Sequence, residues 1–532
     1  MTFMWREKSE AGKRKSHLLP LVSIVAAGMI CYLPVLCNGF LRYDDYGLLV
    51  NNPLVKDPSW RGLGRILSEF YASNYQPVVL ILLRVLYALF GLNELVFHLV
   101  PLLFHAANSC LLYLILNQVG VSRRIAVICT LLFSLHPLRV EAVAWVYAGF
   151  SYTISAFFFL AAVLSYLEGL AQVGKANVRW QTLALFGMAV LSKPVAIVLP
   201  FALCAIDFLL KRPMNISRLK EKWLLLGQGA MLLLIATWAQ HAGGATSVSG
   251  DFGTWERLVI PLKAMAFYVS KTLWPFGLTV LVPYPTHDNL FSTGSYGSLL
   301  VLLIPWMVWF LAVDRRRSIL FGVVWYLVCI FPVLRLIPIG HSLVGDRYSY
   351  LPSIGLSIGL GFILTGISNA KIRGATVVSL GVCIVLLATL SRQQAQIWKD
   401  DVSLWKHAVS VTPDSILAHT HLGSAFSMAG RLGEAHKEFR MVQRWAPDLP
   451  NGDFGLGKLY GQRGEFEQSI KHFERVIRLD PDHNEAYTWL GVSFCGLKQW
   501  EKAYQSFQKA RRLGGKVPMR FYREASRRLN EL

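Results

Sequence analysis

Charge is scarce in this sequence of 532 residues, of which only 16% are charged and 54% are hydrophobic. Soluble globular chains carry about 25% charged residues, so this chain has too little charge to cover a water-facing surface along its whole length. Hydrophobic runs dominate residues 18–390, whereas from residue 396 onward the composition is that of a soluble polypeptide. We therefore expect a membrane-embedded domain, 1–395, followed by a soluble domain, 396–532.

The sequence also lacks the cysteine spacing of a disulfide framework or a zinc site. None of its eight cysteines forms a CxxC pair, and most lie inside hydrophobic runs, where they are expected to pack as small buried side chains. The net charge of +21 would suit a nucleic acid, but many Lys and Arg residues stand in short loops beside hydrophobic runs. Membrane topology explains that placement, so we expect no nucleic-acid partner.

Hydrophobic runs that approach the length of a membrane-spanning helix, about 20 residues, recur through the first domain. The first run, 18–36, follows a basic head and precedes no small-residue cleavage site, which predicts a retained anchor rather than a signal peptide. Two stretches with cations and prolines, 55–92 and 255–297, are expected to lie along the outer membrane interface instead. Ten further spans, which make about eleven in all, are expected at 95–117, 124–138, 141–167, 180–192, 194–210, 223–240, 298–313, 318–334, 351–368 and 375–391.

The cations in the loops give these spans an orientation. With the N-terminus in the cytoplasm, every cytoplasmic loop contains Lys or Arg, as the positive-inside rule requires. An odd number of spans then puts the second domain outside an inner (plasma) membrane, in the periplasm or another extracytoplasmic space. The loop cations are Arg123 and Arg124; Lys175 and Arg179; Lys211, Arg212, Arg218, Lys220 and Lys222; Arg315, Arg316 and Arg317; and Lys371 and Arg373.

Four residue columns recur in the second domain at a period of 34 residues. The period is that of a tetratricopeptide repeat, in which small residues let two helices approach, Phe fills the joint and Pro ends the second helix. The columns predict repeats near 414–447, 448–481 and 482–515 and a capping helix at about 518–532, so the whole chain is expected to be all-α. The consensus Trp is replaced by His419, Asp453 and Tyr487. The columns are Pro413, Pro447 and Pro481; Gly423, Gly457 and Gly491; Ala435, Ser469 and Ala503; and Phe439, Phe473 and Phe507.

Ionisable residues within or beside a membrane are costly, which makes them candidates for a functional site. Each also has a structural interpretation, such as a helix cap, a local ion pair or a packed polar group; Arg139 and Lys193, for example, could pair with Glu141. Together they would line an outer cavity suited to an anionic, lipid-linked substrate. In the expected orientation they gather on the outer side: Asp44, Asp45, His136, Arg139, Lys193, Arg335, His341, Asp346 and Arg347.

These segments resemble a known family. DDY at 44–46, HPLRVEAVAWV at 136–146, SKP at 192–194 and GDRYSYLPSIG at 345–355 occur in that order and are followed by the repeats. The set resembles the C-type membrane glycosyltransferases, and among them the transmembrane and tetratricopeptide repeat-containing O-mannosyltransferases and their bacterial relatives. The resemblance spans nearly the whole chain.

The resemblance implies transfer of a sugar from a polyprenyl-phosphate carrier to an acceptor, with inversion at the anomeric carbon. A carboxylate must take the proton of the acceptor hydroxyl, and cations must stabilise the departing phosphate. Neighbouring side chains diverge, so one of Asp44 and Asp45 is expected to face the substrate, and we favour Asp45 as the base. The candidates for the carrier phosphate are Lys193, Arg347, Arg335, Arg84 and His341, with His136, Arg139 and Asp346 as secondary candidates.

Some members of the resembled family use no metal and others recruit a divalent cation. The sequence shows no cluster of metal ligands, so we expect none to be required. The repeats favour a protein or peptide acceptor, held in their groove, over other acceptors. Two other functions stay open: a non-catalytic, membrane-anchored scaffold for envelope or secretion assembly, and a transporter, which is disfavoured because no inverted repeat is visible.

Overall fold

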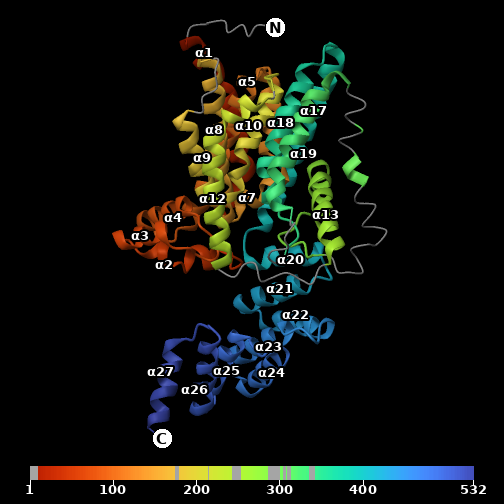
Figure 1. Ribbon diagram of the computed structural model, residues 1–532. Helices are drawn as coiled ribbons and strands as arrows, with labels where there is room; N and C mark the ends of the chain where they lie inside the picture. Colours follow the sequence, from red (N-terminus) through yellow and green to blue (C-terminus); the bar gives the residue numbers. More distant parts are fainter. Residues whose placement is uncertain are drawn as a thin grey trace. The chain divides into compact units, whose positions relative to one another are not determined.

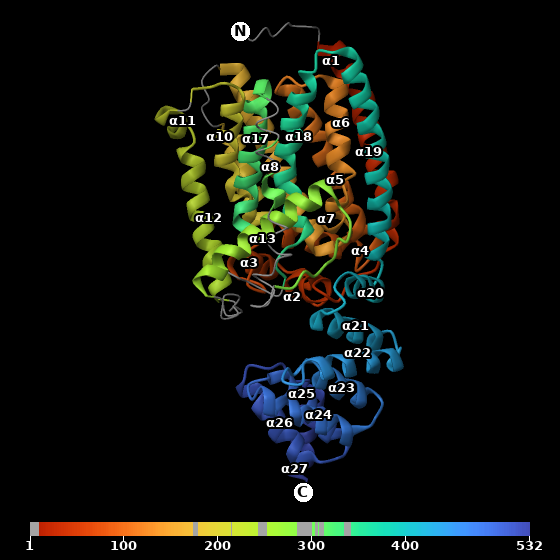
Figure 2. The same ribbon diagram turned by 90° about the vertical axis from the view of Figure 1, so that its right-hand side faces the viewer.

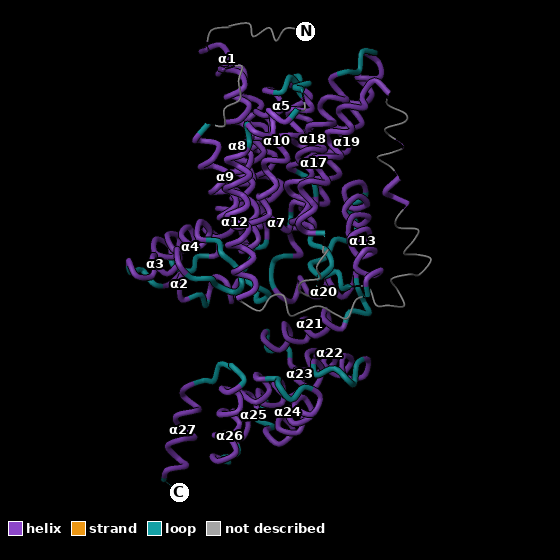
Figure 3. The backbone as a smooth tube through the Cα atoms, in the orientation of Figure 1, coloured by secondary structure: helices purple, strands orange, loops and turns teal. Residues whose placement is uncertain are grey.

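The computed structural model describes residues 10–173, 179–213, 215–242, 253–284, 300–303, 307, 313–334 and 342–531. These residues form helices and loops, with one isolated β-bridge between Tyr71 and Asn74 (Figures 1 and 3). The all-α prediction is confirmed. The chain divides into two compact units, Met1–Asp400 and Asp401–Leu532, close to the change in composition.

Seven helices of the first unit are long and apolar enough to cross a membrane. A further candidate is a pair bent by 60°, in which α6 (Arg123–Ser134) is followed by Pro137–Ala144. Figure 2 shows these helices running alongside one another as a bundle. The seven are α1 (Glu10–Tyr32), α5 (Glu94–Gln118), α8 (Val146–Val173), α12 (Trp223–Ala242), α17 (Arg316–Ile330), α18 (Tyr350–Thr365) and α19 (Ala370–Ile397).

The predicted spans coincide with helices, but fewer than eleven of these are long enough to cross alone. The spans predicted at 180–192 and 194–210 fall on shorter apolar helices, α9 (Trp180–Ser192) and η4 with α10 (Pro194–Leu209). Such helices can reach across a bilayer only with the support of their neighbours. The span predicted at 298–313 lies mostly outside the described residues. The membrane bundle is therefore as expected, and the number eleven stays a prediction.

Residues 55–92, expected along the interface, form short helices instead of a span. Pro53 and Pro77 open two of these helices, in the first turn where a missing N–H costs no hydrogen bond. Figure 1 shows the helices beside one end of the bundle. Their apolar side chains pack on Phe97 of α5 and Phe150 of α8, which fixes the segment to the bundle. The helices are α2 (Pro53–Lys56), α3 (Trp60–Ser68) and α4 (Pro77–Phe90).

A buried charge cluster holds the bundle together where α8 ends and α12 begins. The carboxylate of Asp207, on α10 (Leu199–Leu209), is paired with Lys222 at 2.5 Å and with Arg212 at 2.6 Å. The hydroxyl of Tyr166 donates to the same carboxylate at 2.8 Å. Lys222 is completely buried. Lys222 and Arg212, two of the predicted loop cations, thus also belong to a buried ion-pair cluster.

The second unit is a stack of helix pairs, as the repeat columns predict. The columns meet in space: a methyl group added at Gly423, Gly457 or Gly491 would lie 2.7, 2.8 or 2.5 Å from a Phe ring of the paired helix. Only glycine permits that approach, which explains why Gly recurs at this position in every repeat. The pairs are α21 (Ile416–Met428) with α22 (Leu432–Trp445), α23 (Asn451–Gln462) with α24 (Phe466–Leu479), and α25 (Asn484–Gly496) with α26 (Trp500–Arg512), flanked by α20 (Asp401–Val411) and α27 (Met519–Asn530).

Acid–base pairs occupy the place of the missing consensus Trp in the first two repeats. His419 Nδ1 lies 2.6 Å from Glu438, and His472 Nδ1 lies 2.7 Å from Asp453. In both pairs the partners are 19 residues apart, one on each helix of the repeat, with acid and base exchanged between the repeats. A directional polar contact therefore replaces aromatic packing in this column.

Replacement of Gly491 by Ala should destabilise the repeat unit by about 1–3 kcal/mol, because the added methyl group overlaps the ring of Phe507. Hydrogen exchange of the full-length chain should then show faster exchange of amides in α25 and α26. Gly433→Ala is the matched control, because nothing lies within 4 Å of the added methyl group and helical Ala is favoured over Gly. Equal exchange in both variants would contradict the assigned role of the glycine column.

Candidate active site

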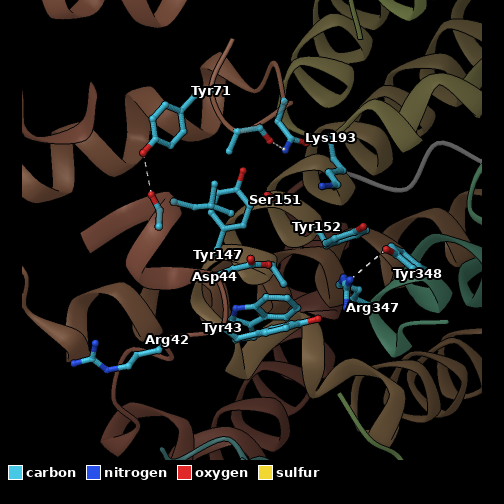
Figure 4. A pocket seen from close by; sticks show the side chains of 16 residues that line it. Arg42, Tyr43, Asp44, Tyr71, Tyr147, Ser151, Tyr152, Lys193, Arg347 and Tyr348 are labelled. Carbon is cyan, nitrogen blue, oxygen red and sulfur yellow. Dashed lines mark hydrogen bonds between the residues drawn. The ribbon is translucent and has the colours of Figure 1, made fainter. Parts of the chain in front are cut away.

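The candidate site is a cavity of about 540 Å³ at one end of the bundle. Five segments far apart in the sequence line it: the loop after α1, the turn before α4, the start of α8, the break between α9 and η4, and the segment before α18 (Figure 4). Four of these segments contain the sequence motifs, and the fifth is the turn before α4. The lining side chains include Arg42, Tyr43, Asp44, Tyr71, Asn74, Trp145, Tyr147, Ser151, Tyr152, Lys193, Arg347 and Tyr348.

Asp44 is the carboxylate of this cavity. Its side chain makes no hydrogen bond to any other residue that the structure describes, and Arg347 and Lys193 are the cations that act on it. Burial raises the pKa of the Asp44 carboxyl, whereas the charges of Arg347 and Lys193 lower it. The group is thus a carboxylate without a structural bond, facing two cations across an open volume (Figure 4).

Asp45 has the structural role in the pair. It is fully buried, and its carboxylate accepts the backbone N–H of Leu41 and that of Tyr147, each at 3.0 Å. The carboxylate therefore ties the loop after α1 to the start of α8. Asp45 does not line the cavity. The base predicted from the sequence is Asp45, whereas the geometry favours Asp44.

Glu141 holds Arg347 at the cavity wall. The Glu141 carboxylate is almost fully buried, accepts the backbone N–H of Arg347 at 2.7 Å and forms an ion pair with the Arg347 guanidinium. The guanidinium also lies 4.9 Å from the ring centre of Trp145. The hydrogen bond and the ion pair together fix both the orientation of the Arg347 side chain and the position of its charge. The structural alternative that paired Glu141 with Arg139 or Lys193 is not what the structure shows.

Lys193 reaches the cavity from a break between two helices. Its backbone is extended, with φ −154° and ψ 122°, because the next residue is Pro194, which disfavours a helical conformation before it. The Lys193 ammonium lies 5.2 Å from the ring centre of Tyr152. The SKP sequence thus ends α9 at the cavity and leaves a cation there.

The remaining candidates from the sequence do not line the cavity. Arg84 donates to the carbonyl of Ser59 at 2.7 Å, and His136 bonds the carbonyl of Thr272 at 3.1 Å. Arg139 is buried and donates to the hydroxyls of two serines, Ser349 and Ser353, at 2.9 Å each. Asp346 is buried beside Arg347 without lining the cavity. Arg335 and His341 lie outside the described residues.

Polar side chains that are not among the predicted site residues form a further, polar wall of the cavity. Tyr147 and Ser151 both donate to Oε1 of Gln76, at 3.2 and 2.9 Å, and the Gln76 amide donates to Asn74 at 3.3 Å. Tyr147 and Ser151 are four residues apart on α8 and therefore share one face. That spacing indicates a polar face in the sequence. The two residues stand inside a hydrophobic run, however, where a helix face packed in the protein core is the simpler interpretation. A wall of hydroxyl and amide groups suits a ligand rich in hydroxyls.

Within the described parts of the chain, no three His, Cys, Asp or Glu side chains are grouped so that they could hold a metal ion. That no metal is required stays a prediction.

Comparisons with known proteins agree with the motifs. Residues 74–241 match a model of the family described as dolichyl-phosphate-mannose-protein mannosyltransferase, and residues 454–518 match one described as tetratricopeptide repeat. A protein O-mannosyl-transferase of Caenorhabditis elegans is 24% identical over 458 residues, covering 82% of this chain and 64% of the relative. Protein O-mannosyl-transferase TMTC3 of Homo sapiens is 22% identical over 522 residues, covering 82% of this chain and 56% of the relative. The resemblance inferred from the sequence is confirmed, and the chain spans between half and two thirds of the length of these relatives.

Among solved structures, the crystal structure of the Archaeoglobus fulgidus oligosaccharyltransferase tethered with an acceptor peptide covers 72% of this chain and 55% of its own, at 15% identity. The TM-score is 0.41. A likeness at this level carries no argument about the present chain.

Replacement of Asp45 by Ala should destabilise the chain by about 3 kcal/mol, because two buried backbone N–H groups lose a charged acceptor. Asp44→Ala should change stability by no more than about 0.5 kcal/mol, because the side chain has no hydrogen bond to lose within the described structure. The apparent Tm of both variants in the same detergent would measure the difference. A similar loss in the two variants would show that the roles of the pair are not divided in this way.

Proposed function

We propose that this chain is a membrane glycosyltransferase that moves a mannosyl group from a polyprenyl-phosphate carrier to a hydroxyl group of a protein. One observation carries the proposal: an Asp44 carboxylate without a structural bond faces Lys193 and Arg347 across one cavity. The names of the relatives support mannose and a protein acceptor, and the family model that matches residues 74–241 supports a polyprenyl-phosphate donor.

The proposed reaction is a single displacement at the anomeric carbon. Asp44 takes the proton of the acceptor hydroxyl as the hydroxyl oxygen forms a bond to the anomeric carbon. The bond from that carbon to the phosphate oxygen breaks, and its electron pair leaves with the polyprenyl phosphate. Lys193 and Arg347 stabilise the charge that develops on the phosphate. Attack on the face opposite the leaving group inverts the configuration.

The polar wall supports a sugar in the same cavity. The Tyr147 and Ser151 hydroxyls are fixed by Gln76, so their remaining lone pairs point in set directions. Fixed acceptors of this kind recognise the hydroxyl pattern of a monosaccharide at low entropic cost. The cavity would then hold the sugar between this wall and the two cations.

The loop charges support a cavity that opens on the outer face. The basic segments at the start of α6, around α11 (Ile216–Lys220) and at the start of α19 stand at the end of the bundle away from α2 and α3, the helices that follow the Asp44 loop (Figure 2). The positive-inside rule puts that end in the cytoplasm. The membrane we propose is the inner (plasma) membrane, with the N-terminus cytoplasmic and the repeats outside. Divalent cations are not part of the proposed reaction.

Asp44→Asn should lower the rate of mannosyl transfer by about 10²–10⁴-fold, the usual contribution of a general base. The measurement is transfer of radiolabelled mannose from polyprenyl-phosphate mannose to a Ser/Thr-containing protein by the purified chain in lipid nanodiscs. Asp314→Asn is the matched control, since Asp314 is an exposed carboxylate at the other end of the bundle. Full activity of Asp44→Asn would exclude Asp44 as the base, whereas the absence of transfer by the unchanged chain would favour the non-catalytic scaffold.

The acid limb of the pH–rate profile should lie above the range of an ordinary aspartate. Burial raises the pKa of Asp44, and a base must be deprotonated, so the rate should fall as the pH falls through that raised value. Lys193→Gln should move the limb to still higher pH, because the positive charge of Lys193 lowers the Asp44 pKa. Lys371→Gln, an exposed cation at the other end, should leave the limb unmoved. A limb that does not respond to Lys193→Gln would exclude Asp44 as the titrating base.

A further inference from the structure

The indole ring of Trp145 contacts three other groups beside the cavity. The Arg347 guanidinium lies 4.9 Å from its ring centre, the Tyr43 ring 5.2 Å and the Trp398 ring 5.9 Å. The two indole rings are stacked, with 21° between their planes. Trp145 and Arg347 line the cavity, whereas Trp398 is not among the lining residues. Trp398 therefore lies behind a ring that contacts a cation of the site.

The two tryptophans are held by their ring faces rather than by hydrogen bonds. Each is 2% exposed, and neither indole N–H has a hydrogen-bond partner within the part of the chain that the structure describes. A buried N–H without a partner costs free energy that an apolar side chain would avoid. The presence of Trp at both positions thus indicates that the broad ring faces are what these positions require.

Trp398 stands at the end of α19, where the helix is fastened to the loop after α1. The Asn38 amide donates to the carbonyl of Ala395 at 3.4 Å, and the N–H of Gly39 donates to the carbonyl of Lys399 at 3.0 Å. Only 11% of the most apolar part of α19 is buried, so this end is the fixed part of a largely exposed helix. The Trp398 ring has a rigid support.

A ring face can hold a guanidinium without occupying its N–H groups. Arg347 already directs N–H groups at Glu141 and at the Tyr348 hydroxyl, the latter at 3.2 Å. A phosphate binds to the edge of a guanidinium through the N–H groups that remain. Contact with the Trp145 face restricts the plane of the guanidinium and leaves those groups to the phosphate.

We propose that Trp398 is a positioning residue for the carrier phosphate: it holds the Trp145 ring in the orientation at which Arg347 meets that phosphate. The role assumes the proposed function, in which Arg347 binds the phosphate. Trp398 itself touches neither the carrier nor the sugar and acts through Trp145. All three residues belong to the first unit, so the role does not involve the repeats.

The test measures equilibrium binding of tritiated farnesyl phosphate, a short polyprenyl phosphate, to the purified full-length chain in nanodiscs of zwitterionic lipid. Trp398→Phe keeps a ring face, whereas Trp398→Met fills a similar space with a flexible side chain that has none. Trp398→Met should weaken binding about tenfold and Trp398→Phe no more than about threefold. Binding of farnesol, which lacks the phosphate, should be the same in both variants and in the unchanged chain.

A double-mutant cycle with Arg347→Gln separates this role from general packing. Arg347→Gln alone should weaken binding about a hundredfold, and Trp398→Met should then add no more than about a further twofold. Trp405→Met is the matched control, because Trp405 is also 2% exposed and stacks on His421 at 4.2 Å, but belongs to the second unit. This control should lower the apparent Tm and leave the affinity for farnesyl phosphate unchanged.

The same tenfold loss in the unchanged chain and in the Arg347→Gln chain would overturn the proposal, because Trp398 would then act without Arg347. Trp145→Leu, which replaces the ring beside the guanidinium, is a second variant in case Trp398→Met does not fold. Unchanged affinity of Trp145→Leu for farnesyl phosphate would contradict the proposal as well. Failure of the unchanged chain to prefer farnesyl phosphate to farnesol would instead overturn the proposed function, and the role of Trp398 with it.

Discussion

The carboxylate of Asp45 is the contact on which the candidate site depends. It accepts two backbone N–H groups, one from its own loop and one from the first turn of α8. These two bonds fix the loop after α1 against α8, the helix that contributes Tyr147 and Ser151 to the polar wall. The neighbouring Asp44 then faces away from the buried side and into the cavity. The position of Asp44 is thus a consequence of the contacts of Asp45, and the two adjacent acids are not interchangeable in the structure.

The segments of the site could be predicted from the sequence, but the direction of several side chains could not. The cost of charge in a membrane marked Asp44, Lys193 and Arg347 as candidates, and the cavity contains all three. The choice between Asp44 and Asp45 depends on the N–H of Tyr147, 102 residues away. The partner of Glu141 is likewise set by tertiary structure, 206 residues along the chain. Spacing in a sequence carries no information about such pairs.

The repeats were easier to predict, because their contacts are local. Gly491 and Phe507 meet within one helix hairpin, and the same contact recurs in each repeat. The repeat period in the sequence therefore predicts these contacts. The column without Trp was less informative. His419 and Asp453 look like unrelated polar residues until their partners, Glu438 and His472, are seen on the second helices. The exchange of acid and base between the two repeats can be recognised only when the partners on both helices are known.

The charges that line the cavity have a consequence for energetics in a medium of low dielectric constant. Three cations, Arg42, Lys193 and Arg347, line the cavity against one carboxylate, Asp44, so the lining has an excess of positive charge. The proposed phosphodiester donor carries one negative charge, and its arrival would reduce that excess. Proton transfer to Asp44 and departure of the sugar would then move charge from the carboxylate to the phosphate without changing the sum of charges in the cavity. A constant sum throughout the turnover would avoid the solvation cost of creating a new charge beside the bilayer.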